Sequence, residues 1–158
     1  MRTRIRPTLF IFIFLIIINP IVFADGDTMD SKELSRKDFS IIDYNSGVVI
    51  SFFDNMIDII SNIGDPVEIV IGPNTTSSKW DRMVYKYPAF WATAYREWME
   101  IIYLWVQSDQ YSTVRGISIG DSFDDLIDKY GKPDYSQDGE YMYQLEIEET
   151  GGYWILSF

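Results

Sequence analysis

The chain contains the segment Arg115-Gly-Ile-Ser-Ile-Gly-Asp-Ser-Phe-Asp-Asp-Leu-Ile-Asp-Lys-Tyr-Gly-Lys-Pro133. An earlier segment has the same pattern: Val48-Val-Ile-Ser-Phe-Phe-Asp-Asn-Met-Ile-Asp-Ile-Ile-Ser-Asn-Ile-Gly-Asp-Pro66. At a constant offset of 67 residues, seven of the nineteen aligned positions are identical. Self-similarity of this kind is typical of a repeated supersecondary unit, so we expect two tandem copies of one structural element.

Each copy predicts a short strand followed by a short helix. We expect Asp54 and the pair Asp121-Ser122 to accept hydrogen bonds from the free N–H groups at the helix start. Apolar residues then recur at spacings of three, one and three, which makes one apolar helix face: Met56, Ile59, Ile60 and Ile63 in one copy, and Phe123, Leu126, Ile127 and Tyr130 in the other. Gly64 and Gly131 end the helices, and Pro66 and Pro133, two residues later, prevent them from resuming. Helices of about nine residues are unstable alone, so both must pack on a sheet.

The segments after each helix predict antiparallel strands. In the second copy, Asp138-Gly139 is a hairpin turn signal before 140–147, and 153–158 is a terminal strand. In the first copy, 68–71 and 80–87 are strands, and 39–44 with 48–51 form a hairpin ahead of the helix. The sequence therefore predicts an α+β fold of two tandem units, each a short helix followed by antiparallel strands, with the helices packed on one face of the sheet.

The segment 90–105 is compatible with two structures. Its apolar residues have helical spacing, but aromatic and β-branched residues dominate, which favours two strands at 90–95 and 99–107 with a turn at Arg96-Glu97. Strand alternation then places two sets on opposite faces: Met99, Ile101, Tyr103 and Trp105 on one, and Trp98, Ile102, Leu104 and Val106 on the other.

The first 24 residues have the three parts of a secretory signal. Three arginines precede an apolar run from Leu9 to Ile18, and Ala24 supplies a small residue at the expected cleavage point. An uncleaved anchor is the alternative, but the run stops before Pro20 and is shorter than the roughly 20 residues that span a bilayer. We therefore expect a signal peptide at 1–24, a flexible leader at 25–38 and a domain at 39–158 made of repeats 39–107 and 108–158. The mature protein is expected to be secreted or periplasmic, without a stable membrane anchor.

Composition excludes several functional classes. The chain has no cysteine and no histidine, so disulfides, thiol chemistry, histidine bases and Cys/His metal sites are excluded, and we expect no cofactor and no metal. The expected signal peptide 1–24 holds three of the 13 basic residues and none of the 24 acidic ones, so the remaining 134 residues carry a net charge of −14. Such a protein repels nucleic acid. Its acidity either keeps the surface soluble or attracts a basic partner.

The stretch Thr113 to Pro133, with its Gly-x-x-x-Gly-Asp-Ser and Tyr-Gly-x-Pro elements, resembles the signature helix segment of the superfamily of β-lactamase-inhibitor-protein-like and small outer-membrane-assembly lipoproteins. The resemblance covers roughly 39–158. It implies a short helical element packed on a small antiparallel sheet, sometimes in tandem, and a function in binding other proteins outside the cytoplasm. It implies no catalytic residue. The missing lipidation cysteine departs from the lipoprotein members.

Aromatic residues of the central strands are the candidate binding site. Helices cover one face of a small sheet, so the rings on the other face would form an exposed patch, which typically marks a partner surface or a dimer contact. The residues expected to bind a partner protein are Tyr85, Tyr87, Trp91, Trp98, Tyr103 and Trp105. The alternatives are that these rings are core, that they bind carbohydrate or peptidoglycan, or that the acids Asp121, Asp124, Asp125 and Asp128, most simply a solvated helix surface, serve a hydrolase. We expect a non-catalytic protein-binding module, inhibitor-like or an assembly accessory, with a homodimer as an alternative assembly.

Overall fold

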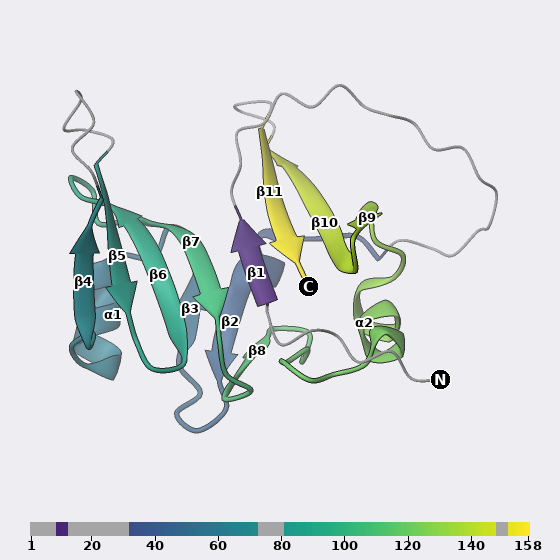
Figure 1. Ribbon diagram of the computed structural model, residues 1–158, viewed down its shortest axis with the longest axis horizontal. Helices are drawn as coiled ribbons and strands as arrows, with labels where there is room; N and C mark the ends of the chain where they lie inside the picture. The colour runs from purple at the N-terminus through teal and green to yellow at the C-terminus, as the bar shows by residue number, and fades with distance from the viewer. Residues whose placement is uncertain (1–8, 13–31, 73–80, 148–151) are drawn as a thin grey trace.

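The structure is a computed structural model that describes residues 9–12, 32–72, 81–147 and 152–158. Its main element is an eight-stranded sheet in which all neighbouring strands are antiparallel (Figure 1). The strand order across the sheet is β4 (Glu68–Ile71), β5 (Arg82–Lys86), β6 (Phe90–Tyr95), β7 (Ile101–Val106), β1 (Leu9–Phe12), β11 (Gly152–Ser157), β10 (Glu140–Ile147) and β9 (Tyr135–Gln137).

A second, three-stranded sheet contains β3 (Val49–Ser51), β2 (Ser40–Asp43) and β8 (Tyr111–Thr113) in that order. The predicted hairpin at 39–44 and 48–51 is therefore confirmed, although it does not extend the main sheet. β2 pairs with β3 on one side and with β8, from much later in the chain, on the other. This small sheet consequently ties the first part of the chain to the part that follows β7.

The two described helices are α1 (Met56–Ile63) and α2 (Phe123–Tyr130). Ser122 caps α2 in a reciprocal capping box with Asp125, as predicted, and the glycines that end both helices have positive φ. The prediction that Asp54 caps α1 is wrong, because Asn55 does so by accepting from the Ile57 amide at 2.9 Å. Asp54 instead accepts from the Ser51 amide at 2.7 Å, and Asp121 from the Ser118 amide at 2.8 Å, so each holds the loop before its helix.

Both helices lie on the same face of the main sheet. Cross-strand partners share a face, and the register aligns Tyr85, Ala92, Leu104, Leu156 and Tyr143 in one buried row. Tyr87, the residue directly after β5, donates its hydroxyl to the Gly64 carbonyl at the end of α1 at 3.0 Å. Tyr143 of the buried row donates in the same way to the Gly131 carbonyl at the end of α2 at 2.8 Å. Figure 1, viewed from the opposite side, shows α1, β2 and β3 behind the strands. We call the side toward the viewer the open face.

The end of the expected flexible leader is folded. Residues Arg36–Phe39 form a 3-10 helix, and Asp38 is buried. Arg115 binds both carboxylate oxygens of Asp38, and its Nη2 also donates to the Glu33 carbonyl at 2.7 Å. The last residues of the expected leader, 36–38, are therefore held by a charge pair with Arg115.

The expected signal peptide is described in part. Its residues Leu9–Phe12 form β1, whereas the predicted cleavage point after Ala24 lies outside the described residues. In the part of the chain that the structure describes, no helix has the length and apolar character needed to cross a membrane. The fold combines helices with antiparallel sheet, as predicted, and strands make up most of its regular structure.

The bond between Tyr143 and the Gly131 carbonyl predicts a stability effect. Both groups are buried, so Tyr143→Phe leaves the carbonyl without its partner, and we expect the free energy of unfolding to fall by about 1–3 kcal/mol in chemical denaturation. Tyr135→Phe is the matched control, because Tyr135 is exposed. An equal effect of the two changes would contradict the role given to Tyr143.

The Asp38–Arg115 pair predicts a pH effect. Burial alone would raise the pKa of Asp38, but hydrogen bonds from Arg115 and Ser35 and the charge of Arg115 hold that pKa below its ordinary value. A carboxyl with a lowered folded pKa stabilises the protein above its unfolded pKa, and this contribution disappears as the pH falls through the folded pKa. We expect Asp38→Asn to cost about 2 kcal/mol at pH 7, with the difference from wild type shrinking below about pH 4.

Denaturation measured from pH 7 to pH 2 checks this expectation. Asp128→Asn is the control, because the Asp128 side chain is 74% exposed and its ion pair with Lys129 spans 3.6 Å. We expect this control to leave stability nearly unchanged. A difference between wild type and Asp38→Asn that stays constant down to pH 2 would refute the assigned charge state.

Candidate functional site

The open face carries one row of side chains across the main sheet. The strand register aligns Glu68, Lys86, Trp91 and Trp105 on β4 to β7, and continues through Ser157, Met142 and Tyr135 on β11, β10 and β9. These positions alternate with the buried row that faces the helices. No described helix covers this row, so the side chains of β6 and β7 on this side are half-buried rather than sealed.

A β-bulge decides which side chains of β7 reach the open face. Thr93 pairs with Tyr103, but the next residue of β6, Ala94, pairs with Ile101, so Ile102 is the extra residue. Strict alternation therefore breaks at this point. Ile101 is completely buried with Leu104 and Val106, whereas Tyr103 and Trp105 lie on the open face. The prediction that Ile101 shares a face with Tyr103 is wrong, while the predicted strands at 90–95 and 99–107 are confirmed in β6 and β7.

Trp91 and Trp105 form the centre of the site. They are direct cross-strand partners, with ring centroids 4.8 Å apart and planes at 68°. The ammonium of Lys86 lies 5.0 Å from the centre of the Trp91 ring, and the same nitrogen makes an ion pair with Glu68 at 2.9 Å. These contacts hold each ring in one orientation, because an edge-to-face pair and a cation over a ring both have defined geometry.

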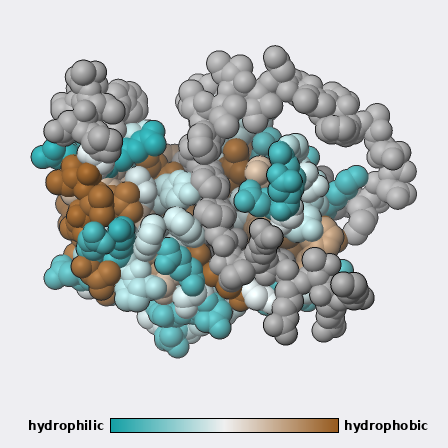
Figure 2. Space-filling model, viewed as in Figure 1, coloured by the Kyte–Doolittle hydropathy of each residue, from teal (hydrophilic) through white to brown (hydrophobic). Residues whose placement is uncertain are grey.

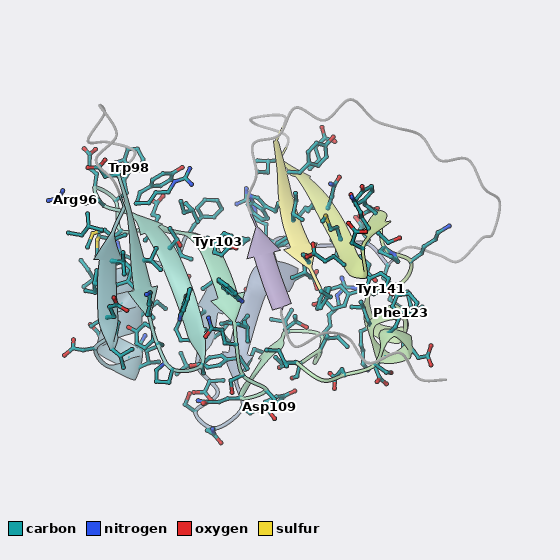
Figure 3. All side chains as sticks on the ribbon, in the orientation of Figure 1. Arg96, Trp98, Tyr103, Asp109, Phe123 and Tyr141 are labelled. Carbon is teal, nitrogen blue, oxygen red and sulfur yellow. The ribbon has the colours of Figure 1, made fainter. Side chains whose placement is uncertain are left out.

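A second aromatic pair lies at the turn between β6 and β7. The ring centroids of Tyr95 and Trp98 are 5.4 Å apart, and Trp98 is 41% exposed. The backbone of this turn is closed by the Met99 amide, which donates to the Tyr95 carbonyl at 2.8 Å. Figure 3 shows Trp98 and Arg96 at this end of the sheet and Tyr103 over β7. Burial raises the pKa of Tyr103 to about 12, so its hydroxyl is protonated at neutral pH and can donate. We call Trp91, Tyr95, Trp98, Tyr103 and Trp105 the aromatic patch.

Tyr85 and Tyr87 are not part of this patch, which corrects the predicted site. Both are buried on the helix side of the sheet, where Tyr87 stacks on Phe90 at 4.7 Å. Burial, with the nearby charge of Asp65, raises the pKa of Tyr87 to about 12. The intervening residue Lys86 points to the open face. The structure therefore brings together four of the six predicted residues and places the other two in the core.

Sequence reasoning missed the other side chains that share the open-face row with the patch. Lys86 and Glu68 join the row from β5 and β4, and Met142 and Tyr135 join it from the far side. The alternation Tyr85-Lys86-Tyr87 could have indicated that Lys86 faces away from the two tyrosines, because successive side chains of a strand point to opposite faces. Figure 2 shows hydrophobic atoms gathered at the β4 edge of the sheet, where Ile71 is 55% exposed.

Comparison with protein-family models, curated proteins and solved structures finds no match to this chain. In the described residues, no group of three or more acidic side chains is placed to hold a metal ion. The open face presents two indole rings of defined orientation beside the ammonium of Lys86.

The exposure of the aromatic patch predicts that substitutions at the neighbouring residues Leu104 and Trp105 differ in their effect on the free energy of unfolding. Leu104 is completely buried, so Leu104→Ala should lower the free energy of unfolding by about 2–5 kcal/mol. Trp105 is half-buried on the other face, and we expect Trp105→Ala to cost less than half as much in the same denaturation experiment. If Trp105→Ala were as costly as Leu104→Ala, the ring would belong to the core.

Proposed function

We propose that this chain is an exported, non-catalytic protein-binding module that uses the aromatic patch on its open face. The observation that carries the proposal is the placement of Trp91, Tyr103 and Trp105, half-exposed, on the sheet face opposite both helices. Tyr and Trp are the residue types that most often dominate binding energy at protein interfaces. Rings already held in one orientation lose little conformational freedom when a partner binds, which favours affinity.

The geometry of the tryptophans favours a protein partner over a sugar. A sugar ring stacks on an unobstructed aromatic face, but Lys86 lies over the face of Trp91, and Trp105 meets Trp91 edge to face. A protein surface can contact such a mixed site through side chains of different shapes. Carbohydrate or peptidoglycan binding is therefore the alternative outcome of the binding test.

Charge on the open face favours a basic partner. Residues of β10 that alternate with the buried Tyr143 include Glu140 and Glu146, both exposed. β10 and β5 belong to opposite halves of the strand order, so these glutamates are remote from Arg82 and Lys86. A basic partner would approach the acidic side, in keeping with a net charge of −14 for the chain without its first 24 residues.

We also propose that the fold is a tandem duplication, as in the superfamily that the sequence resembles. Two sets of equivalent contacts support it. The Ser51–Asp54 and Ser118–Asp121 hydrogen bonds are 67 residues apart. The carbonyl of each helix-ending glycine accepts from a tyrosine hydroxyl, that of Tyr87 directly after the second strand that follows α1 and that of Tyr143 within the second strand that follows α2. The strand order is also mirrored, with β4 to β7 on one side of β1 and β11 to β9 on the other.

Binding experiments with paired variants test the proposed function. We expect the released protein to capture a partner from envelope or exterior fractions, and Tyr103→Ala with Trp105→Ala to weaken that partner's binding at least about 30-fold, as expected for interface hot spots. Tyr44→Ala is the control, because Tyr44 is 60% exposed at a site away from the main sheet.

Equal affinities of the double variant and the control would refute the aromatic patch as the binding surface. Retention of an insoluble glycan by the wild type, in place of a protein, would support the carbohydrate alternative. Self-association that the same double variant abolishes would identify the patch as a homodimer contact.

A further inference from the structure

The strand β1 occupies a gap between the two halves of the main sheet. Its residues Leu9 to Ile11 pair with Leu104 to Val106 of β7, and Phe10 to Phe12 pair with Ile155 to Ser157 of β11, antiparallel in both cases. β7 and β11 therefore run parallel to each other and are separated by one strand. Neighbouring strands are about 4.8 Å apart, so these two are about 10 Å apart.

Cleavage of the expected signal peptide would empty this gap. β1 lies inside the segment 1–24 that we expect to be cleaved. Both β7 and β11 would then present unpaired backbone N–H and C=O groups along an internal edge. Such edges are templates for the addition of another strand.

Contacts beneath the sheet hold the two edges apart. The backbone N–H of Phe53 donates to the Ile101 carbonyl of β7 at 2.9 Å, while the ring of Phe53 lies 5.5 Å from that of Trp154 on β11. Phe39 also packs against Trp154 at 5.4 Å. Phe53 thus spans the gap on the helix side, and closure of the sheet would require its ring and the buried rings of Phe39 and Trp154 to repack.

We propose that the gap between β7 and β11 is an acceptor site for one extended strand of a partner protein, and that β1 fills it only until the signal peptide is removed. This inference rests on the proposed export and binding functions. The added strand runs antiparallel to both β7 and β11. It is uncharged over four residues, like Leu9-Phe-Ile-Phe12, because its neighbours Leu104 and Leu156 are completely buried.

Ser157 adds a preference for one side chain of that strand. It is completely buried, and its Oγ has no hydrogen-bond partner among the described residues. Its register partner in β1 is Phe10, a residue type without a polar side-chain atom. A partner strand with a hydroxyl at this position would satisfy Ser157, since direct cross-strand neighbours are about 5 Å apart at Cβ.

Hydrogen exchange tests the acceptor site. The full chain is expressed for export, the released protein is identified by its intact mass, and a peptide with the sequence of residues 7–14 and a hydrophilic tail is added. We expect a released chain that begins at Asp25, and rapid exchange of those backbone amides in 104–106 and 155–157 that point into the gap, while the alternate amides stay bonded to β6 and β10. The peptide should slow the exchange of the gap-facing amides at least about tenfold, because it restores paired edges.

The control peptide is N-methylated at the residues equivalent to Phe10 and Ile11, whose N–H groups point to opposite neighbours, and it should protect neither edge. Peptides with threonine or valine at the position of Phe10 have nearly equal shape. The threonine peptide should bind about 2–10-fold tighter to the wild type, in line with one net hydrogen bond. This preference should vanish in Ser157→Ala.

Several results would overturn the proposal. The proposal is refuted if the released protein still contains residues 9–12, or if the gap-facing amides of both edges exchange slowly before peptide is added. It is also refuted if the N-methylated peptide protects these amides as well as the unmodified peptide does. Concentration-dependent protection in the free protein would instead assign the gap to a second copy. Equal affinities of the threonine and valine peptides would refute the role of Ser157. The acceptor site and the aromatic patch can fail separately. If the Tyr103→Ala, Trp105→Ala variant loses partner binding but the peptide does not slow exchange in the wild type, only the acceptor site is refuted. If the peptide slows exchange but the double variant binds the partner normally, only the aromatic patch is refuted.

Discussion

Both helices cover the same face of one sheet, and this constraint governs the rest of the molecule. A buried row through Tyr85, Leu104, Leu156 and Tyr143 faces them, so the alternate residues of every strand must face away. On β6 and β7 those alternate residues include indole and phenol rings. A sheet with helices on one side and large aromatic side chains on the other has a surface suited to binding.

The two halves of the sheet are joined on the helix side. The small sheet places β2 between β3 and β8. Arg115 binds Asp38, and it also donates to the Glu33 carbonyl at 2.7 Å and to the Lys129 carbonyl of α2 at 3.1 Å. The ring of Phe53 reaches Trp154 while its backbone is bound to β7. These connections keep the open face in one arrangement and leave β1 as the link between the halves on the sheet itself.

Local signals in the sequence were sufficient for much of this fold. The Ser122–Asp125 capping box, the helix-ending glycines and the Asp138-Gly139 turn depend on neighbouring residues, so they could be predicted. The faces of β7 could not, because the bulge at Ile102 depends on pairing with β6. For the same reason Tyr85 and Tyr87 were assigned to the site, although the register with β6 places them in the core. Pairing of β1 with β7 and β11 is a contact between distant segments, and no local pattern indicates it.

Hydroxyl-radical footprinting of the released protein can establish whether the open face is a binding surface, because it reports the solvent accessibility of individual aromatic rings. If the open face is a binding surface, Trp91, Trp98, Tyr103 and Trp105 react readily in the free protein and become protected when the partner is bound, while Tyr85 and Tyr87 react slowly in both states. If Trp105 and Tyr103 reacted as slowly as Tyr85 in the free protein, the patch would be interior and the proposed binding role would be wrong.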